Sequence, residues 1–206
     1  MAAVKPKRNY PMMDMTAMCD VAFLLLTFFI LTAQFRSQEA AEITTPTSIS
    51  GIKTPDKDAM LISLDKDGKV YFGIDNQVHR TAMLQNMAEA EGVSFTPAEI
   101  KTFSLLENFG VPFNQLKPFL NLPKEKMASF KQPGVPVDST AQNDLAKWVF
   151  NARKANNNLR ILVKGDNLAK FPKFKDVLNA LQAQNINKFY LVTNTEQPPA
   201  GWKEDE

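Results

Sequence analysis

The sequence has little of what enzymes and metal proteins use for chemistry. Its 206 residues include one cysteine, Cys19, and one histidine, His79. A single cysteine excludes an internal disulfide and a cysteine-based zinc site, and a single histidine leaves little for a Ser-His-Asp arrangement. The sequence also lacks a glycine-rich phosphate loop, a nucleophile elbow and a metal-ligand cluster. We therefore expect no enzyme, no bound metal and no cofactor.

The chain also lacks a strong charge of either sign. Its 24 Lys and Arg and 22 Asp and Glu give a formal net charge of +2. So small an excess gives no reason to expect nucleic-acid binding. With 44% hydrophobic residues, the chain has room for one membrane anchor and one modest soluble domain.

One long apolar run stands out, from Met15 to Phe35. It reaches about the 20 residues that span a bilayer core. A cleaved secretory signal is the alternative, because a short basic region precedes the run. Asp14 and Asp20 interrupt the leading part, and no clear small-x-small cleavage pattern follows. We therefore expect a retained transmembrane helix, and the absence of a later apolar run predicts a single-pass protein.

The flanking charges predict the orientation of this helix. Lys5, Lys7 and Arg8 precede it, whereas Arg36 stands alone after it, ahead of Glu39. An excess of Lys and Arg on one short arm keeps that arm in the cytoplasm. About 170 residues would then lie on the far side of the membrane.

Asp20 is a carboxylate in the stretch that must lose its water. An ionised side chain there costs roughly 2.5–3.5 kcal/mol, unless the acid snorkels to the interface, which is the alternative. Thr27 and Gln34 follow Asp20 at intervals of seven residues, and Thr16 precedes it by one turn. These residues share one helix face, which should meet other protein or a water-filled cavity. A desolvated carboxyl binds a proton more readily than one in water, so Asp20 is our candidate proton-responsive group, with its partner groups on other chains.

The segment "DMTAMCDVAFLLLTFFILT" resembles the N-terminal signature of the ExbD/TolR family of biopolymer-transport proteins. That signature is an Asp, a Thr usually followed by Pro, a hydrophobic pair, the Asp of the membrane helix and a Leu/Phe-rich run. The residues in matching places are Asp14, Thr16, Met18, Asp20, Leu25, Leu26 and Phe29. Ala17 replaces the usual Pro, and Cys19 occupies a position more often held by a plain hydrophobe.

The resemblance implies a subunit of a motor driven by the proton motive force, with protons as the coupling ion and Asp20 as the responsive group. It further implies a homodimer of this chain within a pentameric ring of an ExbB/TolQ-like subunit, and a TonB-like periplasmic protein as a further partner. Of the machines of this type, TonB-dependent import is our preference and a Tol-type envelope-maintenance motor the alternative.

The segment after the helix has an extended character. Ile43, Thr44 and Thr45 favour a strand, and Pro46 limits pairing to an edge. A flexible tether is the alternative. The resemblance implies a strand here that pairs between copies or with a partner's linker, and the residues from Glu42 to Ser48 are the candidates for such β-augmentation.

The rest of the chain predicts an α+β domain, a mixed sheet with helices on one face. Residues 59–74 are predicted to form a hairpin, and residues 79–90 a helix that ends at Gly92. Residues 159–166, 171–185 and 188–193 form a β-α-β pattern. We interpret Gly165-Asp166 as loop geometry between the first two of these elements.

Residues 91–138 intervene where the family passes quickly from its first helix to the next strand. Thr96, Pro97 and Glu99 have the spacing of an N-cap, a first helical residue and a capping box, and the helix should end at Gly110. The expected apolar face of this helix consists of Phe103, Leu106 and Phe109. We expect a structured helical subdomain, either a packed extension of the core or a docking surface.

The expected organisation has five parts along the chain. They are a cytoplasmic N-terminal arm (1–13), a transmembrane helix (14–36), a periplasmic linker (37–58), a periplasmic α/β domain (59–194) carrying the segment 91–138, and a mobile tail (195–206). The expected location is the bacterial inner membrane. Two rival classes are a passive membrane-anchored periplasmic scaffold or binding module, and a secreted soluble domain whose first 35 residues are removed.

Overall fold

The structure of the chain is a computed structural model that describes residues 15–32, 41–50, 54–55, 57–138 and 143–196. Two compact units make up the chain, residues 1–37 and residues 38–206. Within its described residues the first unit contains the helix α1 (Met15–Thr32). The elements of the second unit are β1 (Thr47–Ser48), β2 (Ala59–Leu64), β3 (Val70–Ile74), α2 (Gln77–Glu91), α3 (Pro97–Leu105), β4 (Asn108–Phe109), α4 (Phe113–Leu120), α5 (Lys124–Ser129), α6 (Asp144–Ala155), β5 (Arg160–Gly165), α7 (Phe171–Gln182), β6 (Tyr190–Val192) and β7 (Asn194–Thr195).

The larger sheet of the second unit has the strand order β4-β3-β2-β5-β6. The strands β2 and β3 form the expected antiparallel hairpin, and Gly68 in its turn has φ 82°, the left-handed region that favours glycine. The strand β5 runs parallel to both β2 and β6, with α7 between β5 and β6 in the sequence. The expected hairpin, β-α-β unit and mixed sheet are therefore confirmed.

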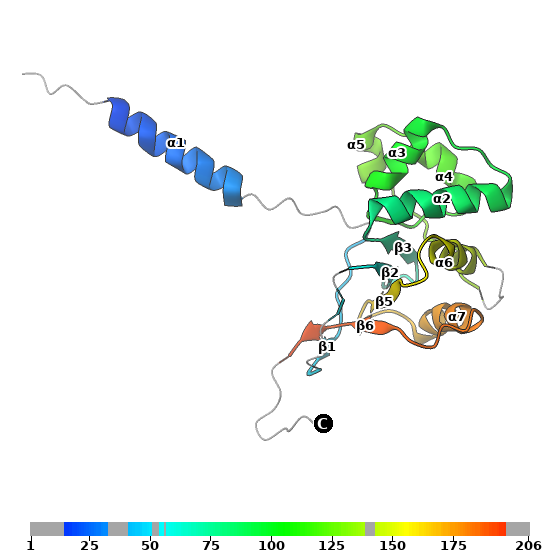
Figure 1. Ribbon diagram of the computed structural model, residues 1–206. Helices are drawn as coiled ribbons and strands as arrows, with labels where there is room; N and C mark the ends of the chain where they lie inside the picture. Colours follow the sequence, from blue (N-terminus) through cyan, green and yellow to red (C-terminus); the bar gives the residue numbers. More distant parts are fainter. Residues whose placement is uncertain (1–14, 33–40, 51–53, 56, 139–142, 197–206) are drawn as a thin grey trace, which may run out of the picture. The chain divides into compact units, whose positions relative to one another are not determined.

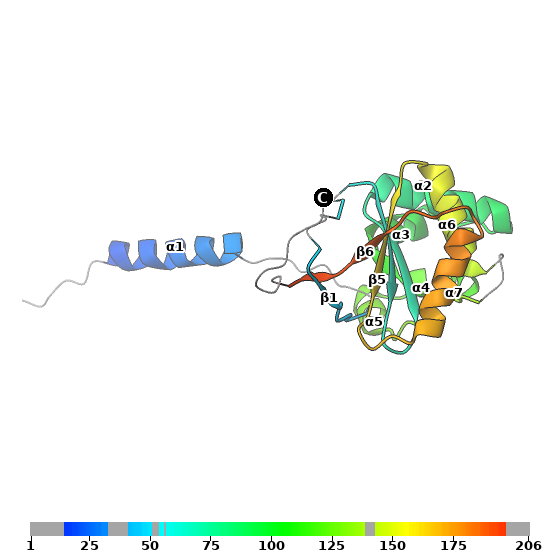
Figure 2. The same ribbon diagram turned by 90° about the horizontal axis from the view of Figure 1, so that it is seen from below.

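The helices α2, α6 and α7 lie on one side of this sheet, and the described part of residues 41–58 runs on the other (Figures 1 and 2). The register explains why one face is so apolar. Ile62 of β2 lies opposite Phe72 of β3 and beside Val163 of β5. Residues paired in this way share a face, and all three belong to the hydrophobic core. The expectation of helices on one face is confirmed.

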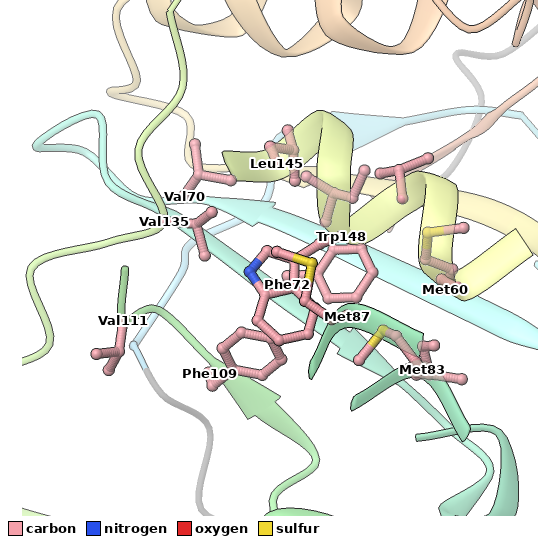
Figure 3. Close-up of a cluster of buried hydrophobic side chains, with 14 of the residues drawn as sticks. Met60, Val70, Phe72, Met83, Met87, Phe109, Val111, Val135, Leu145 and Trp148 are labelled. Carbon is pink, nitrogen blue, oxygen red and sulfur yellow. The ribbon is translucent and has the colours of Figure 1, made fainter. Parts of the chain in front are cut away.

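The centre of the core is a group of aromatic rings around Trp148 of α6 (Figure 3). The Trp148 ring stacks on Phe72 and Phe103 and meets Phe109 edge-on, with ring centroids 4.9 Å apart in the last pair. Phe103 and Phe109 come from residues 91–138, whereas Phe72 and Trp148 do not. This segment is therefore built into the same core as the rest of the domain.

The helix expected to end at Gly110 ends earlier. The capping box of Thr96 and Glu99 is confirmed, but α3 stops at Leu105, and Phe109 lies in β4, where it pairs with Phe72. The outer edge of β3 offers unpaired peptide groups, and pairing with them outweighs a further helical turn. Gly110 is needed for another reason, since a Cβ there would lie 2.4 Å from the Tyr71 ring.

The helices α4 and α5 are short, as the prolines of this segment predict. Pro112 and Pro123 occupy their N-cap positions, and Pro118 lies inside α4. Leu116, Phe119 and Leu120 of α4 are buried in the shared core. Of the two roles left open for residues 91–138, packing against the core is present, and docking of a partner stays a prediction.

Candidate functional site

The helix α1 is 18 residues long, which corresponds to about 27 Å at 1.5 Å per residue. A bilayer core is about 30 Å thick. Among the described residues, α1 is the one helix long and apolar enough to cross a membrane. The hydroxyl groups of Thr27 and Thr32 donate to the carbonyls of Leu24 and Phe28, at 2.9 and 2.8 Å. These bonds satisfy within the helix two polar groups that would otherwise meet hydrocarbon.

Asp20 lies in the second turn of α1, and its side chain is exposed on the described helix. Helical geometry puts Thr16 about 40° and Thr27 about 20° around the axis from Asp20. These three residues therefore lie on one face. Gln34, the fourth member of the expected polar face, lies outside the described residues, as does Asp14.

The large apolar residues of α1 are exposed all around the helix. Phe23, Leu24, Phe28 and Ile30 each expose more than half of their surface, and no residue between Met15 and Thr32 is buried. So much exposed apolar surface is typical of a helix that lies in lipid or packs against other protein. The single carboxylate on it, Asp20, must take its surroundings from the same source.

The candidate partner strand, the residues from Glu42 to Ser48, is a strand over its last two residues, and its pairing with another chain stays a prediction. Residues from Glu42 to Pro46 form no strand, and the strand β1 covers Thr47 and Ser48. The reason lies in the bonds these residues make: the backbone N–H of Thr44 donates to a carboxylate oxygen of Asp166, and Pro46 has no N–H to donate. Glu42 is exposed, Ile43 is half-buried and Thr45 is buried.

The strand β1 pairs in parallel with β7, close to the end of the described chain. The N–H of Asn194 donates to the carbonyl of Pro46 at 2.9 Å, and the N–H of Glu196 to that of Ser48 at 3.0 Å. The mobile tail expected from residue 195 therefore does not begin there, because Thr195 pairs with Ser48. Residues 197–206 lie outside the described part of the chain.

Asp166 joins the linker to the end of β5. Its two carboxylate oxygens accept the N–H groups of Leu168, at 2.8 Å, and of Thr44, at 2.9 Å, and the N–H of Asn167 donates to the Thr44 carbonyl at 2.8 Å. The bonds from Leu168 and Thr44 lower the pKa of Asp166. The sequence predicted loop geometry at Gly165-Asp166, and the contact with Thr44 was missed because 122 residues separate the partners.

A pocket beside this junction is lined by parts of four segments. Its lining consists of Ala41, Glu42 and Thr44 of the linker, Asp65, Lys66, Asp67, Lys69 and Tyr71 of the hairpin, Phe130 to Gln132, and Asp166 to Leu168. Within it the Tyr71 hydroxyl donates to Asp65 at 3.4 Å. Burial first, and then the Asp65 charge, raises the pKa of Tyr71 to about 12, so this phenol stays protonated at neutral pH.

The model of one protein family, "Biopolymer transport protein ExbD/TolR", matches residues 6–196 of the chain. This range includes α1, the linker and the whole described part of the soluble domain, and its bounds enclose residues 91–138. No curated protein and no solved structure matches the chain. The match therefore agrees with the resemblance in the membrane helix and extends it to nearly all of the sequence.

Proposed function

Because the chain belongs to the ExbD/TolR family of biopolymer transport proteins, we propose that it is the inner-membrane subunit of a motor that uses the proton motive force to energise TonB-dependent import. Members of this family are motor and transport proteins, not enzymes, and generally work with ExbB/TolQ and TonB/TolA partners. The observation that carries the proposal is a single carboxylate, Asp20, on the otherwise apolar α1 of a chain that matches this family almost throughout.

In the proposed mechanism, protons are the coupling ion and Asp20 binds and releases them. Charge crossing the membrane field is worth about 2.3 kcal/mol for each elementary charge and 100 mV. A protonated Asp20 is neutral and tolerates an apolar surface, whereas the ionised form requires a polar partner or water. Alternation between these forms would change which face of the neighbouring subunits α1 prefers.

The neighbours of α1 in this proposal are five copies of an ExbB/TolQ-like subunit, arranged as a ring around two copies of this chain. The polar face of α1, with Thr16 and Thr27 beside Asp20, would then meet the inner wall of the ring. The exposed apolar surface of α1 supports such a covering by other chains.

The proposed orientation places the N-terminal arm in the cytoplasm and the soluble domain in the periplasm. The basic residues Lys5, Lys7 and Arg8 support this orientation. Motion of α1 would reach the soluble domain through the linker. Pairing of the residues from Glu42 to Pro46 with a second copy or a TonB-like protein would first require Thr44 to leave Asp166 and Asn167. In the described chain the following residues, Thr47 and Ser48, already pair with a strand, β7, which supports the pairing capacity of this region.

The test is Asp20→Asn in living cells, because Asn keeps the size of Asp but cannot ionise. Energy-dependent uptake across the outer membrane should be lost, while membrane levels and co-purification of the ring subunit stay at wild-type values. Cys19→Ala is the matched control, since Cys19 is exposed on the same helix turn but about 100° away from Asp20; it should retain uptake.

Three outcomes separate the candidate functions. Lost uptake with an intact complex supports the import motor. Normal uptake with new sensitivity to detergents would assign the chain to an envelope-maintenance motor of the Tol type instead. Wild-type behaviour in both assays would refute the proton role of Asp20 and leave a passive membrane-anchored module.

A further inference from the structure

The linker contacts the soluble domain at Thr44, where the backbone N–H and the backbone carbonyl both form hydrogen bonds. The Thr44 N–H donates to Oδ2 of Asp166, and the Thr44 carbonyl accepts the N–H of Asn167. Asp166 is itself fixed, because its own N–H donates to the carbonyl of Leu64 at 2.9 Å. Thr44 is thus attached to the carboxyl ends of two adjacent strands, β2 and β5.

The pairing that follows Thr44 in the chain is small. The strands β1 and β7 have two residues each, and a ladder of that size is not stable by its own hydrogen bonds. The additional bond from the Asn194 side chain to the Thr45 carbonyl is long, at 3.3 Å. The bond from Thr44 to Asp166 is charge-assisted, and such a bond is stronger than the neutral hydrogen bonds of the β1–β7 pair.

We infer that Asp166 is a positioning residue: its carboxylate anchors the linker at Thr44, keeps β1 in register with β7, and so passes displacement of the linker to the sheet. The mechanical part rests on the proposed function, because only a motor subunit has a displacement to pass. The anchor itself rests on the contacts of Asp166 alone.

Each oxygen of the Asp166 carboxylate has its own donor. Oδ1 accepts the N–H of Leu168, two residues further along, which shapes the loop before α7. Oδ2 accepts the N–H of Thr44, which belongs to the linker. One side chain thus combines a local turn with a distant contact, and the two roles can be separated by removing one oxygen.

Asp166→Asn makes this separation. Asn still has one oxygen and forms the same kind of turn as Asp, but its other terminal atom is an amide group that only donates. Two donors would then face each other at Thr44. If Asp166 only shaped its loop, Asn would be an adequate replacement; if it anchors the linker, Asn would release Thr44. Asp67→Asn is the matched control, since Asp67 lines the same pocket and is exposed, with its Lys69 ion pair at 4.0 Å.

The first measurement is hydrogen exchange by mass spectrometry on the full-length chain in its complex. Asp166→Asn should raise exchange in peptides covering residues 44–48 and 194–196 on the order of tenfold, with the core strands unchanged. Asp67→Asn should match wild type. Wild-type exchange in Asp166→Asn would overturn the anchor and leave Asp166 as a loop residue.

The second measurement is energy-dependent uptake in cells carrying the same variants. Released exchange together with reduced uptake, and normal uptake in Asp67→Asn, supports the mechanical role. Released exchange with full uptake would overturn that role, provided that Asp20→Asn abolishes uptake in the same cells. If Asp20→Asn also leaves uptake intact, the proposed motor function is refuted, and so is the mechanical role of Asp166 that rests on it. The exchange measurement still tests whether Asp166 anchors the linker.

Discussion

The two units of the chain differ in how much apolar surface each one buries within itself. The soluble domain buries a core of apolar side chains from its sheet, its helices and residues 91–138. The helix α1 buries none of its residues between Met15 and Thr32. The domain is therefore specified by contacts within its own unit, whereas α1 is identified by its length and composition.

Because of this difference, we expect variants in the two units to act in different ways. A substitution in the core of the domain should change the free energy of unfolding, and any loss of function should follow from that. A substitution on α1 should leave unfolding of the domain unchanged and act on function directly.

The largest effect is expected for Phe109→Ala. Phe109 is fully buried, and its ring meets Trp148 at 4.9 Å between centroids. Removing such a ring costs about 3–5 kcal/mol in free energy of unfolding. Urea unfolding of the full chain in detergent, followed by tryptophan fluorescence, measures this cost. Leu105→Ala, in the neighbouring α3 and 55% exposed, should change it by less than about 0.5 kcal/mol. Equal effects of the two variants would contradict the shared core.

Much of this core could be predicted from the sequence, and the exceptions have one cause. The hairpin around Gly68 and the capping box at Thr96 are local patterns, and both were predicted correctly. The strand β4 was missed because Phe109 also fits the helical spacing that starts at Phe103. The edge of β3 that draws it into the sheet lies more than 30 residues away in the chain, and spacing alone does not reveal such a partner.

A smaller effect is expected for Arg80→Met. Arg80 of α2 is buried and donates to the carbonyls of Ser104 and Leu106, at the end of α3, and to that of Asp75 at 3.0 Å. Loss of the guanidinium leaves these carbonyls without that donor. Burial lowers the pKa of Arg80, and this desolvation cost of the charge offsets part of the loss. We expect a net destabilisation of about 2 kcal/mol.

Arg153→Met is the control for Arg80→Met, measured by the same urea unfolding. Arg153 of α6 contacts the side chain of Asn157, one helical turn away, at 3.3 Å on the surface. Its loss should stay within about 0.5 kcal/mol. If Arg80→Met were equally mild, the attachment of α3 to α2 would have to depend on apolar contacts alone.

A still smaller, pH-dependent effect is expected for Glu99→Gln. The Glu99 carboxylate accepts the Thr96 N–H and the Asn121 amide, both at 2.7 Å, and the Thr96 bond is the main reason why the pKa of Glu99 is lowered. A group with a lowered pKa in the folded state stabilises above its ordinary pKa, and this contribution is lost as the pH falls through the lowered value.

Glu99→Gln should therefore lower the free energy of unfolding by about 1 kcal/mol at neutral pH. The difference from wild type should shrink at about pH 3, where an ordinary Glu is protonated. Urea unfolding at the two pH values measures it, with Glu89→Gln, an exposed acid on α2, as the control. A difference independent of pH would show that the charge of Glu99 does not contribute to the cap.

The candidate site was predictable to a different extent in the two units. Asp20 stands out in the sequence because a carboxylate contrasts with its apolar neighbours, and that contrast needs no structure. Asp166 does not stand out, because an acid after a strand is an ordinary loop residue, and its partner Thr44 is identified only by the folded chain. The strand β1 is shorter than expected for the same reason: Thr44 and Thr45 favour strands, but Thr44 bonds to a side chain, and of the residues from Glu42 to Ser48 the last two form β1.

The smallest effect on the domain is expected for a pair of variants in α1, Thr27→Val and Thr32→Val. Both hydroxyls bond to carbonyls within the helix, so both variants remove a similar bond and neither should change unfolding of the domain. Thr27 shares the face of Asp20, whereas Thr32 lies about 120° from it. If that face meets the ring subunit, Thr27→Val should reduce energy-dependent uptake about threefold, the typical weight of one polar contact between membrane helices, and Thr32→Val should not. Equal uptake in the two variants would confine the functional face to Asp20, and a shift in unfolding of the domain by either would show that α1 and the domain are not specified separately.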